Sequence, residues 1–157
     1  MKIDNIDLKI LSELQQNGKI ANTELAMRVN LSPSPCLARV KRMESNGLIQ
    51  NYVTVLDSRL LGLELNVFIS ISLKTQSRTL LRDFEDRVCS HDEVMECYLM
   101  SGDADYLIRV VMPDIAALER FIVDELSLIP GVEKIRSSFA LKQVRYKTAL
   151  PLRKREA

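Results

Sequence analysis

Apolar residues recur at helical spacing in the first third of the chain. The first run begins beside Asp4 and Asp7, acids that are favourable in the first turn of a helix, and it ends at an Asn-Gly pair typical of helix ends. Asn22 predicts the N-cap of a short second helix over residues 23–29. The pattern therefore opens with two consecutive helices. The apolar members of the first run repeat about every 3.6 residues: Ile3, Ile6, Ile10, Leu11 and Leu14.

The stretch LSPSPCLARVKRMESNG, residues 31–47, predicts a third helix. Proline lacks an N–H and has a φ close to the helical value, so a helix tolerates it in the first turn. Either Ser32 caps a helix that begins at Pro33 or Ser34 caps one that begins at Pro35, and the pattern allows both. Two helices, a tight turn and a third helix follow the order of a helix-turn-helix.

The third helix has two different faces when its residues are placed about 100° apart. One face is apolar and predicts contact with the core: Leu37, Val40 and Met43. The other face carries small residues and three cations, which suit a polyanion, and in a helix-turn-helix the last helix enters the major groove. The cations are expected at phosphates and the small side chains at base edges. The predicted DNA-binding set is Ser32, Ser34, Pro35, Ala38, Arg39, Lys41 and Arg42.

The segment LIQNYVTVLD, residues 48–57, is rich in β-branched residues around a polar Gln-Asn centre. It predicts two short strands joined by a turn, which form the wing of a winged helix-turn-helix. From Leu65 the period changes to two, and alternate apolar residues predict a strand. The elements expected after that strand are a helix over 79–90, strands over 94–100 and 106–112, a helix from Asp114, and a last strand from Val132 to about Tyr146.

This order predicts an α+β chain in which a winged helix-turn-helix domain precedes a ferredoxin-like βαββαβ sandwich domain with both helices on one face of an antiparallel sheet. The expected boundaries are 1–62 for the first domain with its linker strand, 63–150 for the second, and 151–157 for a basic tail. The uncovered sheet face would carry residues such as Phe68 or Phe139, which favours a homodimer or a higher assembly.

Charge separates the same regions. Residues 1–60 carry 8 Lys/Arg against 6 Asp/Glu, residues 61–141 carry 8 against 14, and residues 142–157 carry 6 against 1. The acidic middle region would be repelled by a phosphate backbone, so we expect the two domains to have different tasks. The tail cations Arg153, Lys154 and Arg155 either contact DNA or belong to an ordinary solvated terminus, and the second interpretation is favoured.

Composition excludes several other classes. The 157 residues are 46% hydrophobic, but no apolar run approaches the ~20 residues that a membrane span needs, and MKIDNIDLK lacks the apolar stretch of a secretory signal. Three cysteines without a C-x-x-C pair fit a reducing compartment, and we expect a cytoplasmic protein. Cys89, His91 and Cys97 match no common zinc framework, so no metal or cofactor is predicted. A single histidine and the lack of a phosphate loop argue against an enzyme.

Together these segments resemble the Lrp/AsnC (feast/famine) family of transcription regulators. The N-terminal residues 3–49 resemble its DNA-binding half, while SGDADYLIRV and IPGVEKIRSSFAL resemble landmarks of its amino-acid-responsive half. The resemblance implies a homodimer that associates to tetramers or octamers, binds double-stranded DNA through the first domain and responds to a small effector, often an amino acid, through the second. No catalysis is implied. The alternatives are a sensor whose winged helix contacts protein, and an architectural DNA binder without an effector.

The resemblance also implies that the turn at Asp103 and Asp105 lies at a subunit interface where effectors bind. An amino-acid ligand needs acceptors for its ammonium group and N–H or hydroxyl donors for its carboxylate. Either aspartate could supply the first, and the Gly102 backbone with Ser137 or Ser138 the second. The expected effector set is Met100, Gly102, Asp103, Asp105, Tyr106, Ser137 and Ser138.

Overall fold

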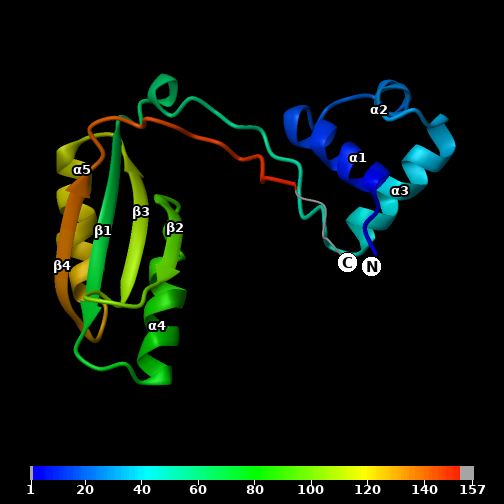
Figure 1. The fold of residues 1–157 in the computed structure, drawn as a ribbon. Coiled ribbons are helices and arrows are strands. Elements are labelled where there is room, and N and C mark those ends of the chain that lie inside the picture. Colours follow the sequence, from blue (N-terminus) through cyan, green and yellow to red (C-terminus); the bar gives the residue numbers. More distant parts are fainter. Residues whose placement is uncertain (1, 153–157) are drawn as a thin grey trace. The chain divides into compact units, whose positions relative to one another are not determined.

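The computed structural model describes residues 2–152, which form two compact units (Figure 1). The N-terminal unit contains the chain up to Val55 together with the segment that starts at Val144, and the C-terminal unit spans Leu56–Gln143. By its contacts the segment that starts at Val144 lies with the N-terminal unit. The sequence-based expectation placed residues 144–150 in the second domain. Among the described residues, no helix is long and apolar enough to cross a membrane.

Three helices form the N-terminal unit: α1 (Asn5–Gln16), α2 (Asn22–Arg28) and α3 (Pro33–Ser45). Asp4 caps α1 by accepting hydrogen bonds from the backbone N–H groups of Ile6 and Asp7, while the Asp7 carboxylate accepts from the Asp4 N–H. This reciprocal capping box satisfies donors that have no partner within the helix.

The structure contradicts the predicted N-cap of α2 and selects one of the two predicted N-caps of α3. The predicted N-cap at Asn22 is wrong, because Ala21 occupies that position and Asn22 is the first helical residue. The Asn22 side chain instead donates to the Pro33 carbonyl oxygen at 2.9 Å and ties α2 to the start of α3. For α3 the structure selects the first of the two alternatives, with Ser32 at the N-cap and Pro33 as the first helical residue.

The core of the N-terminal unit lies where the three helices meet. From α3 it takes Cys36, Val40 and Met43, at positions i, i+4 and i+7. The prediction that Leu37 belongs to this face is wrong, since its side chain is 41% exposed and the fully buried Cys36 takes its place. The buried stripe of α3 therefore includes residue 36 in place of the predicted residue 37. The buried residues are Ile10, Leu11, Leu25, Ala26, Val29, Cys36, Val40 and Met43.

The predicted wing strands are not formed, because residues 48–64 contain no strand in the structure. β-Branched residues favour strands by packing on a pleated, half-buried surface, and this segment has no neighbouring strand to supply one. Val53 and Val55 are accordingly exposed. Tyr52 makes the main polar contact, donating from its hydroxyl to the Glu44 carboxylate at 2.9 Å, and burial followed by this bond raises the pKa of Tyr52 to about 12.

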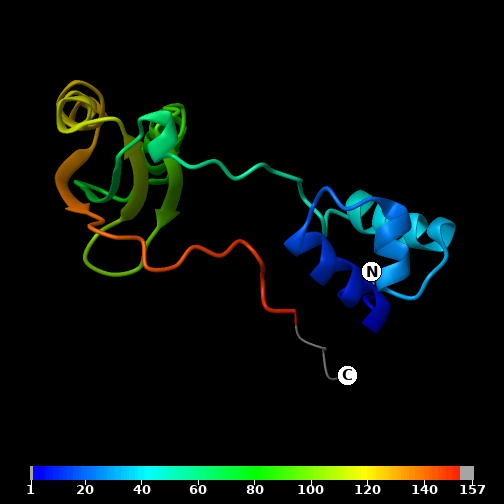
Figure 2. The same ribbon diagram turned by 90° about the horizontal axis from the view of Figure 1, so that it is seen from above.

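The C-terminal unit is a four-stranded antiparallel sheet in the order β2-β3-β1-β4, with α4 and α5 on one face (Figures 1 and 2). This confirms the ferredoxin-like βαββαβ prediction. A π-helical turn, Phe121–Glu125, and a 3-10 turn, Leu126–Leu128, continue α5. The main elements are β1 (Leu65–Leu73), α4 (Arg78–Val88), β2 (Val94–Leu99), β3 (Tyr106–Met112), α5 (Ile115–Arg120) and β4 (Val132–Phe139).

Two element ends differ from the sequence-based expectation. β4 ends at Phe139 rather than near Tyr146, because its pairing partner β1 begins at Leu65 and the last backbone bond joins Ala140 N–H to the Asn66 carbonyl oxygen. Helix α4 begins at Arg78, where the Ser77 hydroxyl accepts a hydrogen bond from the Leu80 N–H, and it ends at Val88 instead of residue 90. The end of β4 is therefore set by pairing with a strand that lies far away in the sequence.

Alternation along the strands separates a helix-covered face from an uncovered one. The rings of Phe84 on α4 and Tyr106 on β3 stack in the covered core with centroids 4.5 Å apart. Phe139 pairs with the buried Val67 and therefore points to the covered side, whereas Phe68 lies on the uncovered face as predicted. Strand residues in the core are Val67, Ile69, Ile71, Leu73, Tyr106, Ile108, Val110 and Met112.

Candidate nucleic-acid interface

Helix α3 presents a stripe of small residues and one lysine directly opposite its buried face. The members of this stripe are Ser34, Ala38, Lys41 and Ser45, all exposed. Ser32 occupies the N-cap without making a capping hydrogen bond through its side chain, so its hydroxyl is not used by the helix. Every residue of the predicted DNA-binding set lies on α3 or its N-cap, and all are exposed except Arg39, which is half-buried.

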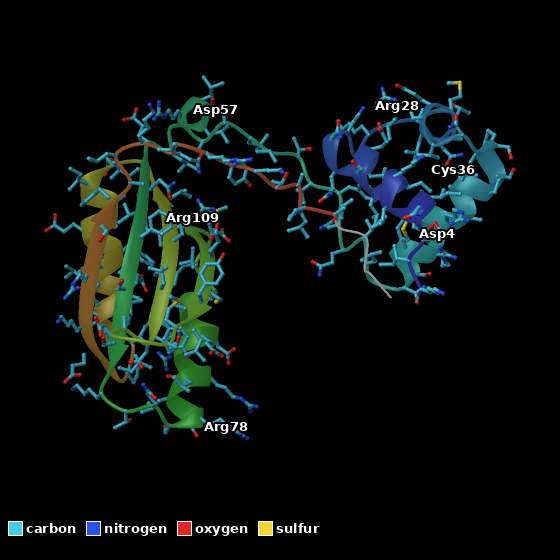
Figure 3. All side chains as sticks on the ribbon, in the orientation of Figure 1. Asp4, Arg28, Cys36, Asp57, Arg78 and Arg109 are labelled. Carbon is cyan, nitrogen blue, oxygen red and sulfur yellow. The ribbon has the colours of Figure 1, made fainter. Side chains whose placement is uncertain are left out.

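Two of the three α3 cations turn toward acids on α1. Arg39 Nη1 donates to Asp4 Oδ2 at 2.7 Å and to Asp7 Oδ1 at 2.8 Å, and Arg42 Nη2 donates to Asp7 Oδ2 at 2.7 Å. Asp4 lies at the start of α1 (Figure 3). Asp7 is completely buried, so its charge needs both arginines to offset the loss of water. These contacts fix the rotation of α3 against α1.

The pKa values of Asp4 and Arg39 reflect these ion pairs. The Asp7 backbone N–H, followed by the Arg39 guanidinium, holds the pKa of Asp4 below its usual value. The pKa of Arg39 is raised by Asp4 first and Asp7 second. The two aspartates and two arginines cancel in charge, which leaves Lys41 as the α3 cation without an ion pair among the described residues.

The spacing of residues along α3 does not predict the ion pairs of Arg39 and Arg42, because the partner aspartates lie 32 to 35 residues earlier in the chain. One signal was available in the sequence. Asp7 stands in phase with the apolar positions Leu11 and Leu14 of α1, at i, i+4 and i+7, so a carboxylate occupies a core position. A buried charge is tolerated when it is paired, and Arg39 and Arg42 are the partners this position required.

Helix α2 is held to α1 by a similar but exposed network. Arg28 donates to Glu13 at 2.8 Å and to Glu24 at 2.6 Å (Figure 3). Glu13 first and Glu24 second raise the pKa of Arg28. The Arg28–Glu13 contact therefore fixes α2 against α1 without involving any residue of the α3 stripe.

The second candidate site is the turn between β2 and β3. Gly102 adopts a φ of 135°, a conformation that favours glycine, and Asp103 beside it is exposed. The Asp105 carboxylate accepts a hydrogen bond from the Leu73 N–H at 2.6 Å and another from the Gln76 side chain. Asp105 thus closes the end of β1, while the Asp103 carboxylate forms no hydrogen bond or ion pair with the side chains and backbone of residues 2–152 and is exposed.

The remaining residues of the predicted effector set fall on different faces of the sheet. Tyr106 is 1% exposed, and its hydroxyl donates to Glu85 at 2.8 Å within the helix-covered side. Ser137 pairs with the buried Ile69, whereas Ser138 pairs with Phe68 on the uncovered face. The structure therefore separates Tyr106 and Ser137 from Ser138, and Met100 is exposed beside the turn.

The uncovered face also carries an ion pair between the edge strand β2 and its neighbour β3. Arg109 on β3 donates to Glu96 on β2 at 2.7 Å (Figure 3). Burial raises the pKa of Glu96, but hydrogen bonds from Tyr98 and Arg109 outweigh it and leave that pKa lowered. The pairing joins two charged side chains on neighbouring strands.

Two family models match the chain. The Lrp/AsnC ligand binding domain matches residues 66–150, more than half of the chain, and a winged helix-turn-helix DNA-binding domain matches residues 3–50. The chain belongs to the Lrp/AsnC family. Its curated relatives include a Bkd operon transcriptional regulator from Pseudomonas aeruginosa, 44% identical over 96% of this chain and 99% of that protein. A leucine-responsive regulatory protein from Escherichia coli is 39% identical over 98% of this chain and 93% of that protein.

Solved structures of Lrp/AsnC proteins agree along the whole length. A transcriptional regulator from Neisseria meningitidis in complex with L-Met has a TM-score of 0.91 at 38% identity and covers 96% of this chain and 97% of that one. An AsnC family regulator from Agrobacterium tumefaciens has a TM-score of 0.90 at 40% identity, covering 95% and 97%. This Lrp/AsnC protein is a DNA-binding transcriptional regulator with a domain for a small effector and is not an enzyme, as predicted.

Proposed function

We propose that this Lrp/AsnC regulator recognises its operator through the exposed stripe of α3, with Ser34 and Ala38 at base edges and Lys41 at a phosphate. The supporting observation is that these small residues lie opposite the buried Cys36 and Val40, so the helix can approach bases closely. The unused Ser32 hydroxyl at the N-cap is a further phosphate donor. The protein acts in the cytoplasm, where its operator lies.

Arg39 and Arg42 take different roles in this proposal. Arg39, held by two carboxylates, acts as a positioning residue that sets the orientation of α3. Arg42 has one ion pair and a side chain that is 43% exposed, so it can still reach a phosphate. Each recognition helix then contributes two cations to DNA binding instead of the three expected from the sequence.

The salt dependence of DNA binding tests this count. Two cations per helix and two helices per dimer give about four phosphate contacts and a log–log slope of about −3.6, compared with about −5 for three cations. Titration of a fluorescent fragment from upstream of the protein's own gene, at several salt concentrations, measures the slope. Lys41→Ala should flatten it by about 2, whereas Lys74→Ala, which removes an exposed lysine from the C-terminal unit, should leave it unchanged.

Three outcomes would contradict this proposal for the interface. A slope near −5 would mean that Arg39 leaves its carboxylates when DNA binds. DNA binding without salt dependence, or no binding at low salt, would favour the alternative in which the winged helix contacts protein.

We also propose that the effector is an amino acid that binds at the turn between β2 and β3. The L-Met complex of the Neisseria relative supports this class of ligand. Asp103, exposed beside Gly102, would accept the ammonium group, and the Gly102 N–H would donate to the carboxylate. Ser138 lies on β4 opposite Phe68, two strands from β3 and toward the other end of the sheet, so it does not reach a ligand at this turn. Asp105, engaged with Leu73, shapes the turn.

Substitution of the two aspartates separates binding from folding. Asp103→Asn should abolish the change in DNA affinity caused by the active amino acid, found by testing the twenty protein amino acids in turn, and leave the urea unfolding midpoint unchanged. Asp105→Asn should lower the free energy of unfolding by about 1 kcal/mol, because the Leu73 N–H loses a charged acceptor. A full amino-acid response in Asp103→Asn would exclude this site.

We propose a homodimer that associates to tetramers or octamers through the uncovered sheet face. Phe68 lies at its centre, and Tyr98 at its edge is exposed in the single chain. In a dimer, two α3 helices would enter successive major grooves about 34 Å apart. Sedimentation of the purified chain with and without the active amino acid measures both the assembly and its response.

A further inference from the structure

The segment of residues 144–152, which we call the C-terminal segment, docks on α1 through one side-chain amide. The Leu150 N–H donates to Gln15 Oε1 at 2.6 Å, and Gln15 Nε2 donates to the Leu150 carbonyl oxygen at 3.2 Å. A single glutamine thus binds both backbone polar groups of one residue, as a neighbouring strand would.

A groove on α1 receives the end of the same segment. Leu152 lies with Leu8 and polar α1 residues around a cavity of about 430 Å³, and it is 37% exposed, whereas Leu150 is 71% exposed. The groove also takes Asn5, Lys9 and Ser12. At helical spacing these residues lie on the side of α1 opposite Ile10 and Leu11, which face the core. The docked segment therefore leaves the α3 stripe open.

The docking gives the DNA-binding unit a second attachment to the sheet, which is covalent at β4 and held on α1 by hydrogen bonds. The first connection is the linker before Leu56, and the second passes from the end of β4 at Phe139 to Val144 through residues 140–143. The docked residue, Leu150, follows the end of β4 by eleven residues that form no helix or strand. The contacts are few and exposed, which makes docking weak enough to be reversed.

We propose that the C-terminal segment of this chain is a strap whose docking on Gln15 and the Leu8 groove restrains the DNA-binding unit and strengthens its binding to the operator. A DNA-binding unit that is held both by the linker and by the docked strap has less orientational freedom to lose when it binds DNA. Release of the strap should therefore weaken DNA binding. The docking does not depend on the proposed function, whereas its effect on operator affinity does.

Hydrogen–deuterium exchange of the full chain tests the docking. Gln15→Ala removes both hydrogen bonds, and Gln16→Ala, the next residue on α1 and an exposed one, is the matched control. Read residue by residue, the Leu150 N–H should exchange about fivefold faster in Gln15→Ala and at the wild-type rate in Gln16→Ala. Leu152→Asp, which places a charge in the groove, should act like Gln15→Ala. Equal exchange in all four proteins would overturn the proposal.

Protein concentration identifies whose segment is bound. Protection that does not change on dilution is expected for a segment of the same chain, while protection that falls on dilution would mean that a second copy supplies it and would overturn the proposal.

Measurements of operator affinity test whether docking of the strap strengthens DNA binding. With unchanged unfolding midpoints, Gln15→Ala and Leu152→Asp should bind the upstream fragment about threefold more weakly than wild type, and Gln16→Ala should match wild type. Faster exchange with unchanged affinity would overturn the restraint. Failure of the wild-type chain to bind DNA would count against the proposed function, and the exchange result would still decide the docking.

Discussion

Ala38→Glu should reduce operator affinity by about a hundredfold or more while the chain folds normally. Ala38 is exposed on α3 one turn after Ser34, at the centre of the stripe that we propose enters the major groove. A carboxylate there would meet phosphates and acceptor groups on base edges, and like charges opposed at an interface cost several kcal/mol. Two such contacts in a dimer exceed the roughly 2.7 kcal/mol that a hundredfold loss represents. Glutamate is a good helix former, so α3 should remain intact.

Ala116→Glu is the matched control for this experiment. Ala116 is an exposed alanine on α5 in the C-terminal unit, and its substitution makes the same change of charge and volume away from α3. Fluorescence anisotropy with the upstream fragment measures both affinities, and circular dichroism confirms folding. Equal affinities for the two variants would mean that another surface binds DNA.

Local signals explain why most of the fold was predictable from the sequence. Two prolines at the start of α3 and an Asn-Gly pair after it mark both ends of that helix, because both marks act through the backbone of the residues themselves. The strict alternation along β1 reflects burial of one sheet face, and its register with β3 and β4 follows from the same period. The ferredoxin-like order needed only these elements in sequence.

Contacts between distant segments account for what the sequence did not indicate. The residues after α3 have strand composition, yet no strand pairs with them, because composition does not supply a partner. Arg39 was expected at a phosphate, and its pairing with Asp4 and Asp7 depends on how α1 packs against α3. Docking of Leu150 on Gln15 joins residues 135 positions apart, which no local pattern marks.

Asp7→Asn should lower the free energy of unfolding of the N-terminal unit by about 3 kcal/mol, because breaking a buried ion pair leaves unpaired charge behind. The asparagine keeps the size of the side chain and one acceptor oxygen, but Arg39 and Arg42 lose the charge that both contact. Urea unfolding followed by far-ultraviolet circular dichroism measures the change. Operator affinity should fall as well, since α3 is no longer held in its orientation.

Asp4→Asn is the control for Asp7→Asn. Each variant removes one carboxylate that Arg39 contacts, but only Asp7 is buried, so the difference between them measures the effect of burial. Asp4 is half exposed, and asparagine caps a helix as well as aspartate does, so its loss should cost less than about 1 kcal/mol. The pKa of Asp4 is lowered in the folded chain, so its contribution is complete above the ordinary value of 3.8 and disappears as pH falls through the lower folded value. Wild type and Asp4→Asn should therefore converge in stability under acid. If Asp7→Asn were no more destabilising than Asp4→Asn at neutral pH, the buried aspartate would not be what fixes α3.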